Sequence, residues 1–280
     1  MTIEEVIDLA LIEDLGDGDH TSLATIPKYA IGKAMLTAKE NGILAGVKVA
    51  TEVFKKIDPD IQIEFLKKDG DFIQSGDIVF TLEGKSQLLL SAERTALNFI
   101  QRMSGIATFT HQVVQKLEGL QTKVLDTRKT TACNRVIEKL AVKIGGGHNH
   151  RFGLYDMIMI KDNHVDFAGG IQQAISATKT YLNKKGKDLK IEIEVRDFAE
   201  LDEVMLTGGV DRIMLDNFTP SDLEIAVRLI DGKYETEASG GISIDNIRKY
   251  AETGVDFISV GALTHQIKSL DLSLTAKLPV

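Results

Sequence analysis

The strongest constraint on the fold is a regular alternation of short β-type runs with helical patterns, which begins at residue 123. Most of these runs are rich in apolar residues and carry a charged, small or glycine residue at or near their ends. Strands that alternate with helices over short loops form parallel sheets with crossover helices. The β-type runs cover residues 123–126, 157–162, 191–195, 212–216, 234–239 and 256–261.

Between these runs, apolar residues recur at helical spacing, near residues 133–143, 168–185, 197–207, 220–230 and 244–253. Six such runs, with room for one more, are too many for a small open sheet and suit a closed α/β barrel. An open doubly wound sheet is the alternative. No G-x-G-x-x-G follows the first run, which counts against the dinucleotide-binding form of such a sheet.

The residues before 123 follow a different pattern, in which glycine turns bracket short strands and helices lie between them. Residues 86–118 predict a long helical stretch with a soft break at Ser104-Gly105, because serine and glycine are poor helix formers. We expect the remaining helices at residues 2–14 and 46–57 and strands at 33–39, 61–66 and 77–82.

Composition excludes several classes of protein. The 280 residues carry a formal net charge of −8, which argues against a general binder of nucleic acid or anionic membranes. No apolar run approaches the roughly 20 residues that span a bilayer. The acidic, amphipathic N-terminus resembles neither a signal nor a transit peptide, so we expect a cytoplasmic protein. The single cysteine, Cys133, excludes an intramolecular disulfide and a multi-thiolate metal site.

In an α/β barrel the active site lies at the carboxyl ends of the strands. One polar residue at a strand end is ordinary, since strands leave the core there. Here, however, every run carries a residue suited to binding or catalysis at or near its end, and all the ends meet on one face. In chain order the runs carry Asp126, Lys161, Glu194, Asp216, Ser239 and Gly261 at or near their ends.

The last two strand ends predict a phosphate site. "SGGI", which contains Gly240 and Gly241, precedes one helical pattern, and "VGAL", which contains Gly261, precedes the next. Exposed backbone N–H groups and the helix dipole favour a phosphate at such positions. The loops after the last two strands are also the usual phosphate site of α/β barrels.

Cations cluster near the earlier strand ends and imply a polyanionic substrate, because arginine forks bind carboxylates and lysine acts as a point charge. Glu194 and Asp216 could hold Mg²⁺, bind sugar hydroxyls or stabilise positive charge on a sugar ring. A polyanion beside a sugar phosphate suggests transfer of a phosphorylated sugar. The cations are Arg94, Arg128, Lys129, Arg151 and Lys161.

The stretch "GGGHNHR" raises the question of a metal. On a strand His148 and His150 would face the same side, and His164 could complete a zinc site. The fixed positive charge of Arg151 beside the pair disfavours a cation, and no acidic ligand is close in sequence. We therefore expect one of these histidines to act as an anion-binding donor.

Seven motifs, in this order, make the chain resemble the quinolinate phosphoribosyltransferase family, also called nicotinate-nucleotide pyrophosphorylase (carboxylating). The resemblance runs from "ALIEDLGDGDHTS" near the start to "GVDFISVGALTH" near the end, and so covers nearly the whole chain. The motifs are "AERTALNFIQRMSGIAT", "DTRKTT", "GGGHNHRFGLYDMIMIKDNH", "IEIEV", "RIMLDN", "EASGGI" and "GVDFISVGALTH".

The resemblance implies an enzyme that joins quinolinate to phosphoribosyl pyrophosphate with Mg²⁺, and that releases pyrophosphate and CO2 to give nicotinate mononucleotide for NAD biosynthesis. It implies an N-terminal α/β sandwich, residues 1–98 joined by 265–280, and an incomplete α/β barrel, residues 99–264. It further implies a homodimer in which the N-terminal part of one chain closes the barrel of the other.

The resemblance also implies roles for individual residues. Arg94 matches the arginine lent across the dimer, and Lys129, Lys161, Glu194 and Asp216 match the residues expected to be catalytic. Glu194 and Asp216 face the ribose and metal in the family. The other expected substrate contacts are Thr127, Arg128, His150, Arg151, Ser239, Gly240, Gly241, Val260, Gly261 and Ala262.

One segment departs from the family pattern. The family usually has Pro-Gly after "DTRKTT", whereas this chain has Ala132 and Cys133. Because proline and glycine would fix a tight turn, we expect this loop to be less rigid or differently shaped. The departure removes no charged group.

Two other interpretations remain open from the sequence. One is a related phosphoribosyltransferase-like protein associated with molybdate transport, whose substrate is uncertain. "GGGHNHR" and the complete set of cations favour the quinolinate enzyme over it. The other is a catalytically inactive ligand-binding or scaffolding protein, which only the altered loop at 132–135 supports.

Overall fold

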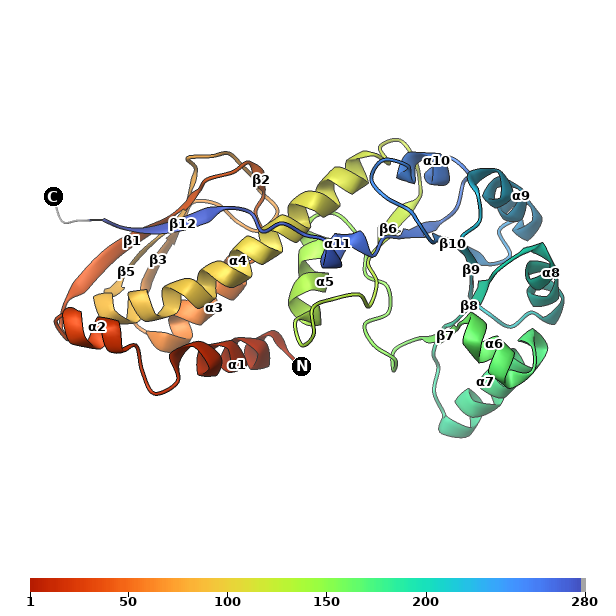
Figure 1. Cartoon of the computed structure of the whole chain (residues 1–280), viewed down its shortest axis with the longest axis horizontal. Coiled ribbons are helices and arrows are strands. Elements are labelled where there is room, and N and C mark those ends of the chain that lie inside the picture. The colour runs from red at the N-terminus through yellow and green to blue at the C-terminus, as the bar shows by residue number, and fades with distance from the viewer. Residues whose placement is uncertain (278–280) are drawn as a thin grey trace. The chain divides into compact units, whose positions relative to one another are not determined.

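The computed structural model describes residues 1–277 of the chain (Figure 1). These residues divide into two compact units. One, here the sheet unit, comprises Met1–His111, Lys129–Gly146 and the residues from Leu263 on. The other, here the barrel unit, comprises Gln112–Arg128 and Gly147–Ala262. The domain boundary predicted between residues 98 and 99 lies inside helix α4 (Ser86–Gln115). The domain bounds implied by the family resemblance remain a prediction.

The sheet unit is built on a four-stranded antiparallel sheet with the order β12-β1-β5-β3. Its last strand in sequence pairs with its first, so that Leu274 lies opposite Leu36. A short pair, β2-β4, lies apart from this sheet. The strands are β1 (Ile31–Ala38), β2 (Gly42–Ile43), β3 (Gln62–Phe65), β4 (Phe72–Ile73), β5 (Ile78–Lys85) and β12 (Leu272–Lys277).

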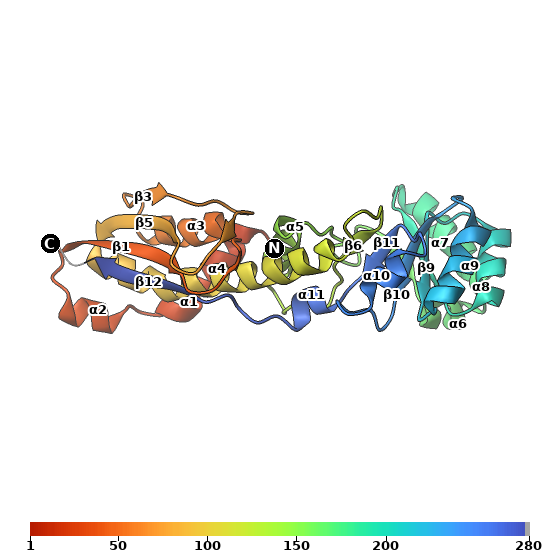
Figure 2. The same cartoon turned by 90° about the horizontal axis from the view of Figure 1, so that it is seen from above.

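Helices cover one face of this sheet, as Figures 1 and 2 show for α3 and α4. The apolar residues of α3 recur at helical spacing, and Phe54 packs edge-on against Phe80 of β5 with their ring centroids 6.4 Å apart. The side chains of α4 close the same core. The helices of the unit are α1 (Ile3–Leu15), α2 (His20–Thr25), α3 (Val47–Ile57), α4 (Ser86–Gln115), α5 (Arg135–Ile144) and α11 (Ala262–His265).

The predicted break at Ser104-Gly105 is wrong, because α4 runs through both residues without interruption. Ser104 is fully buried, and its hydroxyl accepts a hydrogen bond from Ala45 N at 3.0 Å. Gly105 lies against the backbone carbonyl of Lys268, where a methyl group would overlap the oxygen. Both residues therefore serve close packing of the helix and not a kink.

The barrel unit contains six parallel strands with the order β6-β11-β10-β9-β8-β7. All five residues of β8 are buried, as expected for a parallel strand covered on both faces. The strands are β6 (Lys123–Leu125), β7 (Ile158–Ile160), β8 (Ile191–Val195), β9 (Arg212–Asp216), β10 (Glu235–Ser239) and β11 (Phe257–Ser259).

Helices α7 to α9 connect successive strands and lie along one side of the sheet (Figure 1). The predicted helix at 168–185 begins at Ile171, and the short helix before it was not predicted. Its only buried side chain is Val165, so its sequence lacks an apolar stripe. The helices are α6 (Asp162–Ala168), α7 (Ile171–Lys185), α8 (Phe198–Thr207), α9 (Pro220–Ile230) and α10 (Ile247–Ala251).

The barrel is incomplete, as the family resemblance implied, and the closed barrel expected from the strand pattern is wrong. The edge strands β6 and β7 do not pair with each other within the described part of the chain. Instead, His148 forms a parallel bridge with Leu125, which extends the sheet beyond β6 by one short segment. This segment takes the place of the further strand for which the sequence left room. Over residues 1–277 no helix is both long and apolar enough to cross a lipid bilayer.

Candidate active site

The carboxyl ends of the six strands bring several predicted residues to one edge of the barrel sheet. Asp216 and Ser239 are register partners at the ends of β9 and β10. Lys161 follows β7 directly, and Glu194 is the penultimate residue of β8. Because neighbouring parallel strands share their direction, these side chains lie along one edge.

Lys161 and Glu194 form an ion pair at this edge. The ammonium Nζ lies 2.6 Å from Glu194 Oε2, and the carboxylate side chain is only 8% exposed while that of the lysine is 45% exposed. An ammonium group has three donors, so the lysine keeps donors for a second anion. The buried carboxylate fixes the cation in place without covering it.

The stretch "GGGHNHR" is held beside β6 by a buried carboxylate. Asp126 accepts hydrogen bonds from the His150 backbone N–H at 2.9 Å and from Asn149 Nδ2 at 2.5 Å. His148 N also donates to the carbonyl of Val124 at 2.8 Å. The backbone therefore runs along β6 into the barrel, as a continuation of the sheet.

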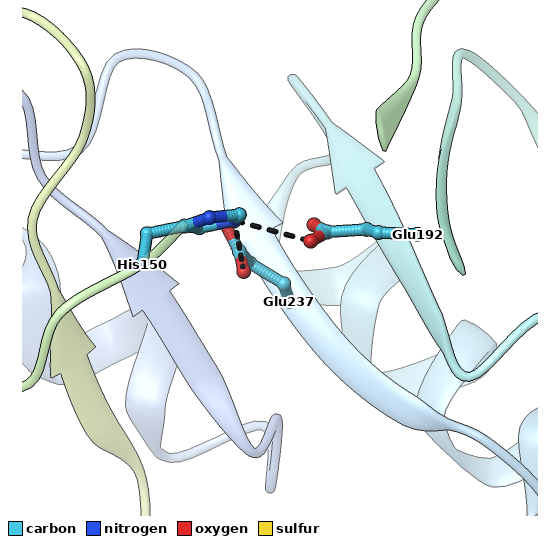
Figure 3. Close-up of side chains that lie close together, drawn as sticks. All are labelled: His150, Glu192 and Glu237. Atoms are coloured by element: carbon cyan, nitrogen blue, oxygen red, sulfur yellow. Dashed lines mark ion pairs between the residues drawn. The ribbon is translucent and has the colours of Figure 1, made fainter. Parts of the chain in front are cut away.

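His150 points into the barrel, toward two glutamates from different strands (Figure 3). Its Nε2 lies 3.1 Å from an oxygen of Glu192 on β8 and 3.3 Å from an oxygen of Glu237 on β10. Neither glutamate is exposed to solvent. Burial by itself would lower the pKa of His150, but the two carboxylates outweigh burial and raise the pKa to about 9.

One further contact bears on the charge of this ring. Nδ1 of His150 lies 2.6 Å from the backbone nitrogen of Arg151, and only a neutral ring can accept that hydrogen bond. The charged carboxylates interact more strongly than a neutral amide. The carboxylates therefore hold the proton of the ring on Nε2, and a second proton on Nδ1 would have to displace the Arg151 N–H.

Arg212 offsets the negative charge of the glutamates, and its Nη1 lies 2.9 Å from Glu237 Oε2. Burial raises the pKa of Glu237, but the hydrogen bond to His150 and the charges of His150 and Arg212 outweigh burial, so the net pKa is lowered. Burial and the charge of Glu237 raise the pKa of Glu192. Two acids and two bases thus share the interior of the barrel.

The buried group around His150 is poorly suited to a metal ion. Among residues 1–277, only His150, Glu192 and Glu237 bring three candidate ligand atoms within 4.8 Å of one another. The guanidinium of Arg212 already lies beside both carboxylates, at 2.9 Å and 3.9 Å, and its charge opposes a bound cation. His148 and His164, the other histidines considered, are exposed and outside this group.

Arg128 and Arg151 are close enough to affect each other. Burial and the neighbouring guanidinium of Arg128 lower the pKa of Arg151. The charges of Glu192 and Asp156 act in the opposite direction and raise the pKa of Arg151. This pair, with Lys161 on β7, makes the edge of the barrel suitable for a substrate with more than one carboxylate.

Models of two domains of one family match this chain. Quinolinate phosphoribosyl transferase, N-terminal domain, matches residues 19–104, and the C-terminal domain of the same family matches residues 106–275. This chain belongs to the quinolinate phosphoribosyl transferase family. The family and the fold class predicted from the sequence are therefore confirmed.

Two curated relatives and one solved structure illustrate the similarity. The chloroplastic nicotinate-nucleotide pyrophosphorylase [carboxylating] of Arabidopsis thaliana is 44% identical over 97% of this chain and 82% of that protein. The probable nicotinate-nucleotide pyrophosphorylase [carboxylating] of Bacillus subtilis is 41% identical over 99% and 94%. The crystal structure of NadC from Streptococcus pyogenes has a TM-score of 0.92 and 41% identity, and covers 98% of this chain and 97% of that one.

The segment after β10, which is predicted to bind phosphate, leads into its helix later than expected. Gly240 and Gly241 have positive φ values of 94° and 62°, which glycine adopts without strain. Helix α10 begins only at Ile247, so the predicted helix start at 244 is wrong. Asn246 explains the delay, since its side chain accepts from Ser243 N at 2.8 Å and donates to the Gly241 carbonyl at 3.1 Å.

The remaining predicted residues fall in different units. Thr127 follows β6 in the barrel unit, and Val260 N donates to the Leu125 carbonyl at 2.9 Å beside it. Gly261 and Ala262 close that unit. Arg94 and Lys129 belong to the sheet unit, where the side chain of Arg94 is exposed on α4. The roles of all these residues remain predictions.

Sequence reasoning missed Glu192, Glu237 and Arg212. A weak signal was present, because "IEIEV" repeats glutamate with period two in an otherwise apolar strand. Period two places Glu192 on the same face as Glu194, inside the barrel. The partnership with Glu237 could not be seen, since β9 separates β8 from β10 in the sheet.

Proposed function

We propose that this chain is a quinolinate phosphoribosyltransferase. It transfers the phosphoribosyl group of phosphoribosyl pyrophosphate to quinolinate with loss of CO2, and it forms nicotinate mononucleotide in NAD biosynthesis. Family membership over nearly the whole chain supports the reaction. The observation that carries the substrate assignment is the ion pair of Lys161 with Glu194 at the strand-end edge that also holds Asp216 and Ser239.

Quinolinate suits this cationic edge because it carries two adjacent carboxylates on a pyridine ring. Arg128 and Arg151 can each accept a carboxylate in a fork, and Lys161 keeps donors beside its ion pair with Glu194. His150 supports this edge from the barrel interior, where its charge is offset by Glu192 and Glu237. Together these groups orient the ring nitrogen toward the ribose.

The opposite part of the edge suits the 5′-phosphate of the ribose. Ser239, Gly240 and Gly241 at the end of β10 offer a hydroxyl and backbone N–H groups on glycines that keep the backbone accessible. Gly261 and Ala262 follow β11, the neighbouring strand. We assign the phosphate to these two loops.

The chemistry follows from charge placed between these subsites. The bond from C1′ to the pyrophosphate oxygen breaks, and the ring nitrogen of quinolinate attacks C1′ as the ribose becomes cation-like. Glu194 and Asp216 stabilise that positive charge. The carboxylate at ring carbon 2 then leaves as CO2, because the positive ring nitrogen stabilises the electron pair left behind, and the carbon takes a proton from water. No nucleophilic side chain is required.

Mg²⁺ is proposed as the cation that accompanies the pyrophosphate. Mg²⁺ commonly binds through one or two carboxylates together with substrate phosphates and water. Asp216 offers carboxylate oxygens at the strand ends, and Glu194 could join it through Oε1, because Lys161 contacts Oε2. The buried group around His150 does not fit, because Arg212 lies beside both of its carboxylates. When bound, Mg²⁺ would neutralise charge on the leaving pyrophosphate.

A homodimer with a shared site is proposed as the active form. Arg94 is an exposed arginine in the motif that matches the family's lent arginine. In addition, an open pocket of about 380 Å³ lies beside the edge strand β7 and is lined mainly by apolar residues such as Leu154, Met157 and Ile160. A partner chain would cover this apolar lining. We keep a cytoplasmic location, without nucleic-acid or membrane partners, as part of the proposal.

The experiment that tests the function compares two acceptors. Purified protein is incubated with phosphoribosyl pyrophosphate and Mg²⁺, together with either quinolinate or nicotinic acid, and nicotinate mononucleotide is measured by chromatography. We expect product from quinolinate alone. Consumption of nicotinic acid but not quinolinate would contradict the assignment, and quinolinate binding in calorimetry without turnover would support the inactive binding protein.

A further inference from the structure

Asn217 has a backbone conformation that its surroundings in the core do not explain. It directly follows β9 and has a positive φ of 58°. A residue other than glycine loses roughly 1 kcal/mol in this left-handed region, although asparagine tolerates it better than most. Asn217 is exposed to solvent, so tight packing does not impose the conformation. Strain of this kind concentrates at functional sites.

Two hydrogen bonds hold Asn217 between neighbouring strand ends. Its backbone N–H donates to the carbonyl of Ser239 at 2.8 Å, which ties it to the end of β10. Its side-chain Nδ2 donates to Asp216 Oδ2 at 2.6 Å. The orientation of the amide follows from chemistry, because an ionised carboxylate can only accept. One residue thus contacts two proposed parts of the substrate site.

The side chain of Asn217 also fills the space above Gly240. A methyl group added at Gly240 would overlap Asn217 Oδ1, so the glycine and the asparagine fit each other. Gly240 itself has a positive φ, which glycine adopts freely. The left-handed turn at Asn217 and the glycine turn after Ser239 therefore form one packed arrangement.

We infer that Asn217 is a positioning residue that couples the carboxylate of Asp216 to the phosphate-binding segment Ser239–Gly241. It acts by fixing the direction of the carboxylate and the course of the neighbouring loop, and it needs no contact with substrate. This inference rests on the proposed function. Because both structures that it fixes belong to the ribose-phosphate side, its removal should affect phosphoribosyl pyrophosphate and not quinolinate.

The main test is Asn217→Gly, measured by steady-state kinetics with each substrate varied in turn. Glycine keeps the left-handed backbone without strain and removes only the side-chain amide. We expect kcat/KM for phosphoribosyl pyrophosphate to fall about tenfold or more, since small misplacements of catalytic groups have effects of this size. The KM for quinolinate should stay within about twofold, and the thermal midpoint within a few degrees.

A matched control is Asp231→Gly. Asp231 also has a positive φ, of 47°, but it lies at the C-terminal cap of α9 and not at the carboxyl ends of the strands. The same substitution there should leave both kinetic constants unchanged. Asn217→Asp is the second variant, because it keeps the size and the backbone preference while replacing the donor with an acceptor beside Asp216.

The outcomes separate a positioning role from a structural one. A selective loss for phosphoribosyl pyrophosphate in a folded Asn217→Gly protein supports the inference. Wild-type kinetics, or an equal loss for both substrates, overturns it. If Asn217→Gly does not fold, Asn217→Asp is judged by the same criteria. Wild-type protein without turnover of quinolinate refutes the proposed function, whereas an active wild type with unaffected variants refutes only the role of Asn217.

Discussion

Cys133 shows at the residue scale how the chain accommodates its departure from the family pattern. It lies where the family usually has glycine, and its φ is 62°, a left-handed value. The thiol is exposed. The turn before α5 is therefore formed without the residue that adopts it most easily. The effect of this departure on the rigidity of the loop remains a prediction.

We predict that Cys133→Gly stabilises the protein. Removing the side chain relieves the left-handed conformation, while glycine adds entropy to the unfolded chain, so the net gain should be up to about 1 kcal/mol. Ala132→Gly is the control, because Ala132 has no positive φ and should lose about 0.5 kcal/mol. Urea unfolding measures both changes. A Cys133→Gly protein no more stable than the wild type would show that the left-handed backbone at Cys133 is not strained.

Because His150 pairs with two buried glutamates, we predict that the free energy of unfolding depends on pH. The pKa of His150 is about 9 in the folded chain against 6.5 for an unperturbed histidine, so its stabilisation is complete below pH 6.5 and is lost as pH rises through 9. The shift corresponds to at most about 3 kcal/mol. We expect the stability difference between wild type and His150→Gln, measured by urea unfolding, to shrink between pH 6.5 and 9.5. An unchanged difference would mean that His150 is neutral.

The sequence predicted many of the candidate site positions, but not how they are connected. Lys161, Glu194 and Asp216 could be found because strand ends are recognisable in sequence and parallel strands end at one edge. The partners of His150 could not, because Glu192 and Glu237 are far apart in sequence and meet only once the order of the strands is known.

At the scale of elements, the six strands lie within one or two residues of their predicted ranges, since apolar runs bounded by polar residues mark buried strands. Strands β2, β4 and β12 were not predicted. The other errors concern helices whose ends depend on tertiary contacts or side-chain caps. Helix α4 continues through Gly105 because the glycine is needed for close packing. Helix α10 starts late because Asn246 forms a local turn first.

A substitution in α4 tests this explanation. Gly105→Ala should destabilise the protein by about 1–3 kcal/mol, because overlap with the Lys268 carbonyl outweighs the helix preference of alanine, which is worth about 1 kcal/mol. Asn98→Ala, an exposed position of the same helix, should be neutral or slightly stabilising. Thermal unfolding compares the two. A more stable Gly105→Ala protein would show that the glycine is not required for packing.

At the scale of the whole molecule, we predict an active site shared between two chains. Arg94→Ala and Lys161→Ala should each be inactive alone. After mixing with subunit exchange, half of the dimers are mixed and each has one intact site, so about a quarter of wild-type activity should return. Verified mixed dimers without any activity would place Arg94 and Lys161 of the same chain in one site.

The most direct test of the central claim is the release of labelled CO2 from quinolinate labelled in the carboxylate at ring carbon 2. The account predicts release that depends on phosphoribosyl pyrophosphate and equals, one for one, the nicotinate mononucleotide formed. Release without phosphoribosyl pyrophosphate, or nucleotide formed with the label retained, would contradict phosphoribosyl transfer followed by decarboxylation at this site.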